Sequence, residues 1–131
     1  MFARHGLKVG LADISSPMLA FSRWRLKHRK LRAQFFDMKV GSVASESFDM
    51  VTAMDVFEHL ADPVEAVEKL CGVLKPGGFL FGRFSAEPNE DRPLHMVEDF
   101  EPTFRCLREL GFIEVWRDDW LWGHQVFKRT A

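Results

Sequence analysis

The sequence has few cysteines and no long apolar stretch, and each scarcity excludes a class of protein. Cys71 and Cys106 are the two cysteines among 131 residues. They are too few for a disulfide framework, and both fall in expected helices, where we predict buried core thiols. No apolar run approaches the ~18 residues that cross a membrane. The first residues, MFARHGLKVG, place charges where a signal peptide is apolar. We therefore predict a cytoplasmic protein without membrane contact.

Signatures of metal and nucleic-acid binding are also weak. No spacing of cysteine and histidine resembles a zinc site, so we predict no metal. Charge is nearly balanced, with 18 Lys+Arg against 19 Asp+Glu, but residues 23–32 (RWRLKHRKLR) are strongly basic. This patch fits either nucleic-acid binding or a solvated helix end whose cations lie near the C-terminal dipole. We favour the helix end over nucleic acid, because no aromatic stacking module accompanies the patch.

Short apolar runs alternate with helical patterns along the chain. The runs at 7–12, 31–36, 48–54 and 79–84 predict strands, and helices are expected at about 16–30, 62–75 and 102–110. Two more strands, 112–117 and about 123–128, are joined by a short turn and should be antiparallel. This order predicts a single α/β domain over residues 1–131, with a Rossmann-like, doubly wound and mostly parallel sheet that ends in an antiparallel hairpin.

Two helix starts are visible in the sequence. Ser15 or Ser16 can cap the first helix, with Pro17 in its first turn, and we expect Met18 and Leu19 to face inward. The segment Asp62-Pro63-Val64-Glu65 combines an N-cap acid, proline at the first helical position and a capping-box acid. These signals fix where two of the helices begin.

Acidic residues follow three of the expected strands. Asp13, Asp37 and Asp55 stand at the ends of the strands at 7–12, 31–36 and 48–54. Ligands of open α/β sheets bind beyond the carboxyl ends of the strands, where such acids can accept ribose hydroxyls or an adenine amine. Carboxylates after strands also form turns and cap helices. Three of them at successive strand ends favour a nucleoside ligand.

Several segments, in their order along the chain, resemble a class I S-adenosylmethionine-dependent methyltransferase. This resemblance covers most of the chain. The segments are LKVGLADISSPML, LRAQFFDM, SFDMVTAMDVFEHLADP, LKPGGFLFGRF and LRELGFIEVW. They are most similar to the small-molecule branch that includes ubiquinone-biosynthesis-type enzymes. The resemblance implies S-adenosylmethionine as cofactor, S-adenosylhomocysteine as product and a small-molecule methyl acceptor.

The resemblance also implies which residues bind the nucleoside part of the cofactor. Asp13 resembles the acid that binds the ribose, and Ile14 resembles its apolar neighbour. Asp37 resembles the acceptor of the adenine amine, with Met38 beside the ring.

Residues at the third strand end match the methionine side of the cofactor. Ala53 and Met54 match the strand end along the methionine part, and residues 56–59 (Val-Phe-Glu-His) match the segment that lines the transfer site, with Val56 touching the cofactor. His59 is one candidate proton acceptor, although a histidine at a helix start can equally bond a neighbouring backbone group. His95 is the second candidate. Three further residues are candidates for the acceptor pocket: Trp120, Trp122 and His124.

One departure from the family pattern is clear. The family's acidic-Gly-x-Gly-x-Gly turn does not occur in these 131 residues, and we expect an N-terminally truncated domain whose first strand is missing. The strands at 7–12 and 48–54 would then pair directly, or another chain would supply the strand in a homodimer, or the sequence is a fragment. The alternative function is a non-catalytic remnant of the fold that acts as an interaction or oligomerisation module.

Overall fold

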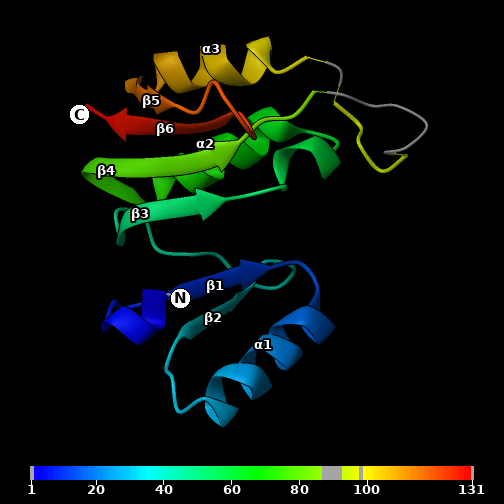
Figure 1. The fold of residues 1–131 in the computed structure, drawn as a ribbon, viewed down its shortest axis with the longest axis vertical. Helices are drawn as coiled ribbons and strands as arrows, with labels where there is room; N and C mark the ends of the chain where they lie inside the picture. Colours follow the sequence, from blue (N-terminus) through cyan, green and yellow to red (C-terminus); the bar gives the residue numbers. More distant parts are fainter. Residues whose placement is uncertain (1, 87–92, 98, 131) are drawn as a thin grey trace. The chain divides into compact units, whose positions relative to one another are not determined.

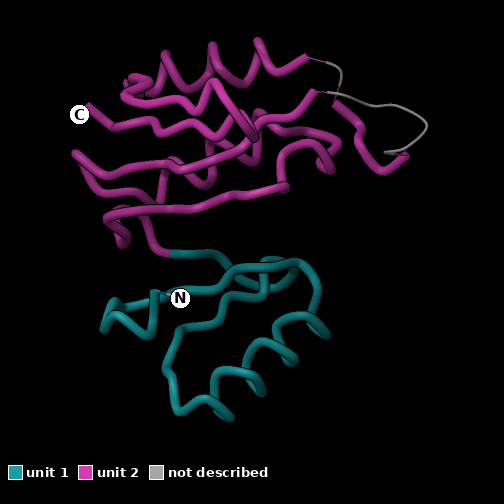
Figure 2. Tube along the Cα trace, viewed as in Figure 1, with its two compact units in different colours: residues 1–43 teal, residues 44–131 magenta. Residues whose placement is uncertain are grey.

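The computed structural model describes residues 2–86, 93–97 and 99–130. The chain forms two compact units, residues 1–43 and residues 44–131 (Figure 2). The expected single domain over residues 1–131 stays a prediction. Among the described helices, none has the length and apolar character needed to cross a membrane.

The first unit is a parallel β-α-β arrangement that follows a short 3-10 helix (Figure 1). Its elements are η1 (Phe2–His5), β1 (Gly10–Asp13), α1 (Ser16–His28) and β2 (Gln34–Asp37). β1 and β2 pair in parallel, and the register places Asp13 directly opposite Asp37. The two strand ends that carry the predicted nucleoside-binding acids are therefore neighbours.

Helix α1 begins where the sequence predicts. The Ser15 hydroxyl accepts the N–H of Met18 at 3.4 Å, and Pro17 lies in the first turn. Leu19 is buried, but Met18 is 53% exposed. The prediction that Met18 faces inward was wrong, because consecutive helical residues point about 100° apart and Leu19 takes the inward position.

The second unit is a four-stranded sheet with two helices. Its elements are β3 (Phe48–Ala53), η2 (Phe57–His59), α2 (Pro63–Gly72), β4 (Leu74–Arg83), α3 (Glu101–Glu109), β5 (Phe112–Arg117) and β6 (His124–Arg129). The strand order is β3-β4-β6-β5, as Figure 1 shows. β3 and β4 are parallel, whereas β6 is antiparallel to both β4 and β5.

The expected mixture of parallel strands and a C-terminal antiparallel hairpin is confirmed. The last two strands pair in antiparallel, and because β4 and β5 both run antiparallel to β6, the strands β3, β4 and β5 share one direction. The described strands make two parallel and two antiparallel pairings, and each sheet lies within one unit. The reversed strand is not at the edge of the sheet, because β6 inserts between β4 and β5 and the hairpin joins the sheet through its second strand.

The capping signal of α2 is confirmed, but the helix ends a few residues before the end expected at about residue 75. The Asp62 carboxylate accepts the N–H of Glu65 at 2.9 Å, as an N-cap acid should. The helix ends at Gly72, and β4 begins at Leu74, several residues before the predicted start of the strand. Gly77 has a φ of +79°, a conformation that suits glycine.

The core of the second unit is apolar and aromatic. Phe57 is fully buried and stacks on Phe84, with ring centroids 4.6 Å apart. Phe84 also meets the edges of three other rings, those of Phe100, Phe104 and Phe127. Cys71 and Cys106 are free and buried in the same cluster. The prediction of core thiols is confirmed, and burial raises the pKa of Cys71 to about 12.

Candidate functional site

The two paired acids of the first unit are held by short turns. Asp13 Oδ1 accepts the N–H of Ser15 at 2.8 Å. Asp37 Oδ1 accepts the N–H of Lys39 at 3.0 Å, and its Oδ2 accepts the Ser16 hydroxyl at 2.9 Å. These hydrogen bonds hold the pKa of Asp37 below its ordinary value, and the bond from the Lys39 N–H has the larger effect. Both acids thus form turns, and each carboxylate keeps further lone pairs for a ligand.

Apolar side chains follow both acids. Ile14 is 62% exposed, and Met38 is half-buried. Each side chain therefore offers apolar surface next to a carboxylate. Such a surface suits contact with the sugar or the base of a nucleoside. The assignment of Asp13, Ile14, Asp37 and Met38 to the cofactor stays a prediction.

The end of β3 in the second unit bends sharply. Ala53 is buried, Met54 is half-buried and Val56 is exposed. Asp55 between them has a φ of +51°, in the left-handed region that non-glycine residues rarely adopt. Its Oδ1 lies 2.7 Å from Nη1 of Arg83. Backbone strain of this kind is concentrated at binding and catalytic sites.

Arg83 links the ends of three strands, and its role was not anticipated from the sequence. Besides Asp55, its Nε donates to the Trp122 carbonyl at 3.0 Å, and its guanidinium lies over the Trp122 ring at 5.5 Å. An open pocket of about 390 Å³ lies here, lined by residues 83–86 and 121–123. Trp122 therefore lines a pocket, as the sequence suggested, whereas Trp120 is 92% exposed and lies outside that lining.

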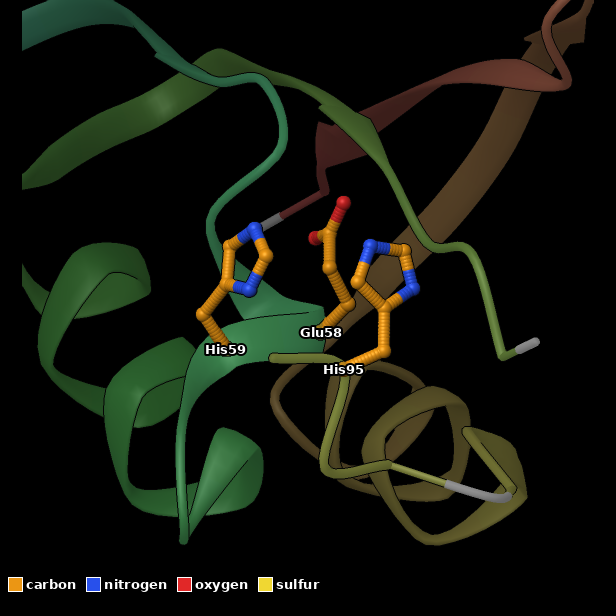
Figure 3. Close-up of side chains that lie close together, drawn as sticks. All are labelled: Glu58, His59 and His95. Carbon is orange, nitrogen blue, oxygen red and sulfur yellow. The ribbon is translucent and has the colours of Figure 1, made fainter. Parts of the chain in front are cut away.

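The two predicted bases come together in the second unit, with a carboxylate beside them. One ligand atom each of Glu58, His59 and His95 lies within 4.8 Å of the other two. The imidazole rings are 5.0 Å apart and nearly perpendicular. In Figure 3, the Glu58 side chain stands between the two rings. The arrangement offers two nitrogens and a carboxylate to one point in space.

Two backbone contacts build this cluster. The Met96 N–H donates to the Glu58 carbonyl at 2.7 Å. Nδ1 of His59 lies 3.0 Å from the Leu94 carbonyl. The contacts on both sides of His95 therefore attach its segment to η2, and they place the His95 ring beside Glu58. The alternative considered for His59, a bond to a backbone group, is present together with the clustering.

Two buried polar atoms of the cluster residues have no hydrogen-bond partner among the described residues. Glu58 is 1% exposed, and its Oε2 has no hydrogen-bond partner among the described residues. Nδ1 of His95 is also buried, and it too has no hydrogen-bond partner among the described residues. A buried polar group without a partner costs about 1–3 kcal/mol, and more when charged. Groups of this kind commonly mark a place where a ligand or ion completes the structure.

A second pocket is lined by residues close in sequence to His59 and to His95. It has a volume of about 410 Å³, and its lining comprises Ala61, Pro63, Val64, Met96, Val97, Asp99, Pro102 and Thr103. Thr103 is fully buried, and its hydroxyl has no partner among the described residues. This pocket is therefore mostly apolar with a polar group on its wall, the usual make-up of a small-molecule site.

Sequence comparison gives the family. The sequence profile of a methyltransferase domain family matches residues 1–80, more than half of the chain. The chain is 32% identical over 82 residues to a ubiquinone biosynthesis O-methyltransferase of Xanthomonas campestris, and 27% identical over 81 residues to that of Coxiella burnetii. These matches cover 60% of the chain and about a third of each relative's length, 34% and 35%.

Solved structures of low sequence identity show the same fold. The N-methyltransferase NodS of Bradyrhizobium japonicum, solved in complex with S-adenosylhomocysteine, aligns over 95% of this chain and 67% of its own, with a TM-score of 0.74 and 20% identity. A SAM-dependent methyltransferase of Methanosarcina mazei aligns over 97% of this chain and 84% of its own, with a TM-score of 0.73 and 15% identity. With the matched profile, they show that the chain belongs to the class I S-adenosylmethionine-dependent methyltransferase domain family.

Proposed function

We propose that this chain binds S-adenosylmethionine and transfers its methyl group to a small-molecule acceptor. The observation that carries the proposal is the register of β1 and β2, which sets Asp13 beside Asp37 at the carboxyl ends of two parallel strands. The family uses this cofactor, and ligands of α/β folds bind at this end of the strands. The curated relatives, of which the chain spans about a third, act in ubiquinone biosynthesis; its own acceptor is a small molecule of unnamed class.

The paired acids divide the nucleoside between them. Asp13 accepts both ribose hydroxyls, with Ile14 beside the sugar. Asp37 accepts the adenine amine, with Met38 against the ring. Because Ser16, Lys39 and Ser15 already fix the two carboxylates, little side-chain entropy is lost when the nucleoside binds. Charge-assisted hydrogen bonds of this type are the stronger class.

The second unit supplies the groups for methyl transfer. Ala53, Met54 and Val56 line the methionine part of the cofactor, as their counterparts do in the family. The reaction is an in-line displacement at a sulfonium methyl group, so the main task of the protein is to position the acceptor and exclude water. His59 and His95 are the residues that take the acceptor's proton when the acceptor is an alcohol, acid or amine. The open pocket beside Arg83 and Trp122 is large enough for a small acceptor.

Calorimetric titration with S-adenosylhomocysteine tests the cofactor assignment. We expect Asp13→Ala to weaken binding by about 1–3 kcal/mol, or roughly 5- to 150-fold, the scale of a lost charge-assisted hydrogen bond. Asp119→Ala is a matched control, because Asp119 is an exposed acid of the second unit. An Asp13→Ala affinity equal to that of the wild type would refute the ribose assignment.

The non-catalytic remnant stays as the second candidate. The acidic-Gly-x-Gly-x-Gly turn of the family does not occur within residues 1–131, and glycines of such a turn let backbone approach the cofactor closely. The two candidates give different titrations. A folded sample that releases no heat at millimolar S-adenosylhomocysteine would support the interaction module and defeat cofactor binding by this chain alone.

A further inference from the structure

We infer that Glu58, His59 and His95 form a binding site for one divalent transition-metal ion, of the kind that zinc occupies. The sequence predicted no metal, because it contains none of the short Cys/His spacings of zinc sites. The structure instead collects three ligands from η2 and from the segment at 93–97. The inference rests on this geometry and holds whether or not the chain transfers methyl groups.

The hydrogen bond of His59 prepares its ring for a metal. A carbonyl oxygen only accepts, so the contact of Nδ1 with the Leu94 carbonyl at 3.0 Å places the proton on Nδ1. Nε2 of His59 then carries a free lone pair. Histidines that bind metals nearly always donate their other ring N–H in this way, to a backbone carbonyl or a carboxylate.

Glu58 has a buried polar atom that an ion would satisfy. Glu58 is 1% exposed, and its Oε2 has no hydrogen-bond partner among the described residues. In Figure 3 the His95 nitrogen that faces the Glu58 carboxylate is Nε2, so this atom is the ligand that His95 offers. A buried carboxylate is normally paired with a cation or coordinates a metal. The cluster therefore contains an unmet requirement for positive charge at its centre.

The spacing of the ligand atoms suits a single ion. All three lie within 4.8 Å of one another, and metal–ligand bonds to histidine and carboxylate are about 2.0–2.2 Å long. Small side-chain rotations therefore bring the three atoms onto one ion. His59 is exposed, so further positions around the ion face solvent. Three protein ligands with an open position are the pattern of a catalytic zinc site rather than a structural one.

The donor set selects the class of metal. Two imidazole nitrogens and one carboxylate suit zinc, cobalt, nickel or iron, whereas magnesium prefers an all-oxygen shell that keeps several waters. No cysteine takes part, because both thiols are buried in the apolar core. The inference is therefore zinc-like binding and not magnesium binding.

A role in methyl transfer depends on the proposed function, and it would replace the proton-accepting role of His59 and His95, because their lone pairs would then bind the ion. An ion at this place would hold a hydroxyl of the acceptor at its open position and lower the pKa of that hydroxyl. The hydroxyl proton would pass to solvent, the oxygen would attack the sulfonium methyl group, and S-adenosylhomocysteine would leave with the sulfur's bonding electrons. This role would restrict the acceptor to alcohols and phenols.

Metal binding by the full chain tests the inference without any cofactor. The protein is stripped with a chelator, dialysed and titrated with Zn²⁺ and Mg²⁺ by calorimetry, and with Co²⁺ by visible absorption. We expect one Zn²⁺ per chain, a Co²⁺ spectrum of low coordination number, a higher melting temperature with Zn²⁺, and no Mg²⁺ binding at the same concentrations. Absence of saturable Zn²⁺ binding, or binding of Mg²⁺ in its place, would overturn the inference.

Two variants of the cluster and one control variant locate the ion. Glu58→Gln and His95→Gln should each weaken Zn²⁺ binding by at least about 10-fold, and both should abolish the Co²⁺ spectrum. His28→Gln is the matched control, since His28 is an exposed histidine of α1, and its affinity should equal that of the wild type. Circular dichroism confirms that each variant is folded, and His95→Gln alone suffices if Glu58→Gln is not. Unchanged binding in the cluster variants would show an adventitious ion and refute the site. S-adenosylhomocysteine titrations are separate, so failure of one proposal is distinguishable from failure of the other.

Discussion

Truncation of Phe57 should destabilise the second unit strongly, because this residue joins the core to the segment that carries Glu58 and His59. Phe57 is fully buried, and its ring stacks on Phe84 at 4.6 Å with an interplanar angle of 3°. Phe→Ala changes at such positions cost about 3–5 kcal/mol, through lost transfer free energy and the cavity left behind. That is a large part of the 5–15 kcal/mol that stabilises a typical domain. We therefore expect Phe57→Ala to be largely unfolded or to melt about 10–25 °C lower.

The milder substitution Phe57→Leu gives a measurable value if the alanine variant does not fold. It keeps most of the apolar volume and loses the aromatic pair, so we expect a loss of about 1–3 kcal/mol. The assay is urea unfolding followed by circular dichroism at equal protein concentration. Trp120→Ala is the control, because Trp120 is a large aromatic that is 92% exposed, and it should change stability by less than about 0.5 kcal/mol. Equal effects of Phe57→Leu and Trp120→Ala would refute the assignment of Phe57 to the core.

Further predictions concern stability, thiol reactivity, pH and association. Asp62→Ala should lower the free energy of unfolding by about 1 kcal/mol, since it removes the cap on the Glu65 N–H; an unchanged urea midpoint would contradict this. Cys71, whose pKa is raised to about 12, should react with a thiol reagent slowly at neutral pH until urea is added, and rapid labelling of the folded protein would show that it is not buried. The pKa of Asp37 is lowered in the folded protein, so its carboxylate stabilises the fold at pH values above the ordinary pKa of about 3.9, and this stabilisation is lost as the pH falls through the lower folded pKa. Asp37→Asn should therefore be less stable than wild type at neutral pH and equal to it in strong acid. A difference in stability that does not change with pH would contradict this linkage. Because β3 is an edge strand of its sheet, light scattering should detect a homodimer at high concentration, and a monomer throughout would remove the predicted sheet completion.

Local signals in the sequence predicted much of the chain's organisation. The Asp62-Pro63-Glu65 segment located the start of α2, because capping depends on residues close in sequence. Cys71 was predicted to be a buried core thiol because it falls in an expected helix, and it is buried. The insertion of β6 between β4 and β5 could not be predicted in the same way. Strand order depends on contacts between distant residues, which alternation of apolar residues does not specify.

The candidate site shows the same division. Asp13 and Asp37 were found because each follows a strand, and the parallel register of the strands sets them side by side. The cluster of Glu58 with His59 and His95 was not predicted, since it depends on backbone hydrogen bonds that attach a distant segment to η2. An adjacent Glu-His pair after a strand is the sequence signal available, and by itself it does not indicate a partner so far along the chain.

An NMR titration of the ¹⁵N-labelled full chain with S-adenosylhomocysteine tests the central claim most directly. The amides of Ser15 and Lys39 donate to the Asp13 and Asp37 carboxylates, so they report on any ligand that those carboxylates bind. Cofactor binding as proposed predicts saturable shifts of both amides, and Asp13→Ala should reduce them at equal ligand concentration. Saturable binding that leaves both amides unshifted, or no binding by the folded chain, would contradict the proposed cofactor site.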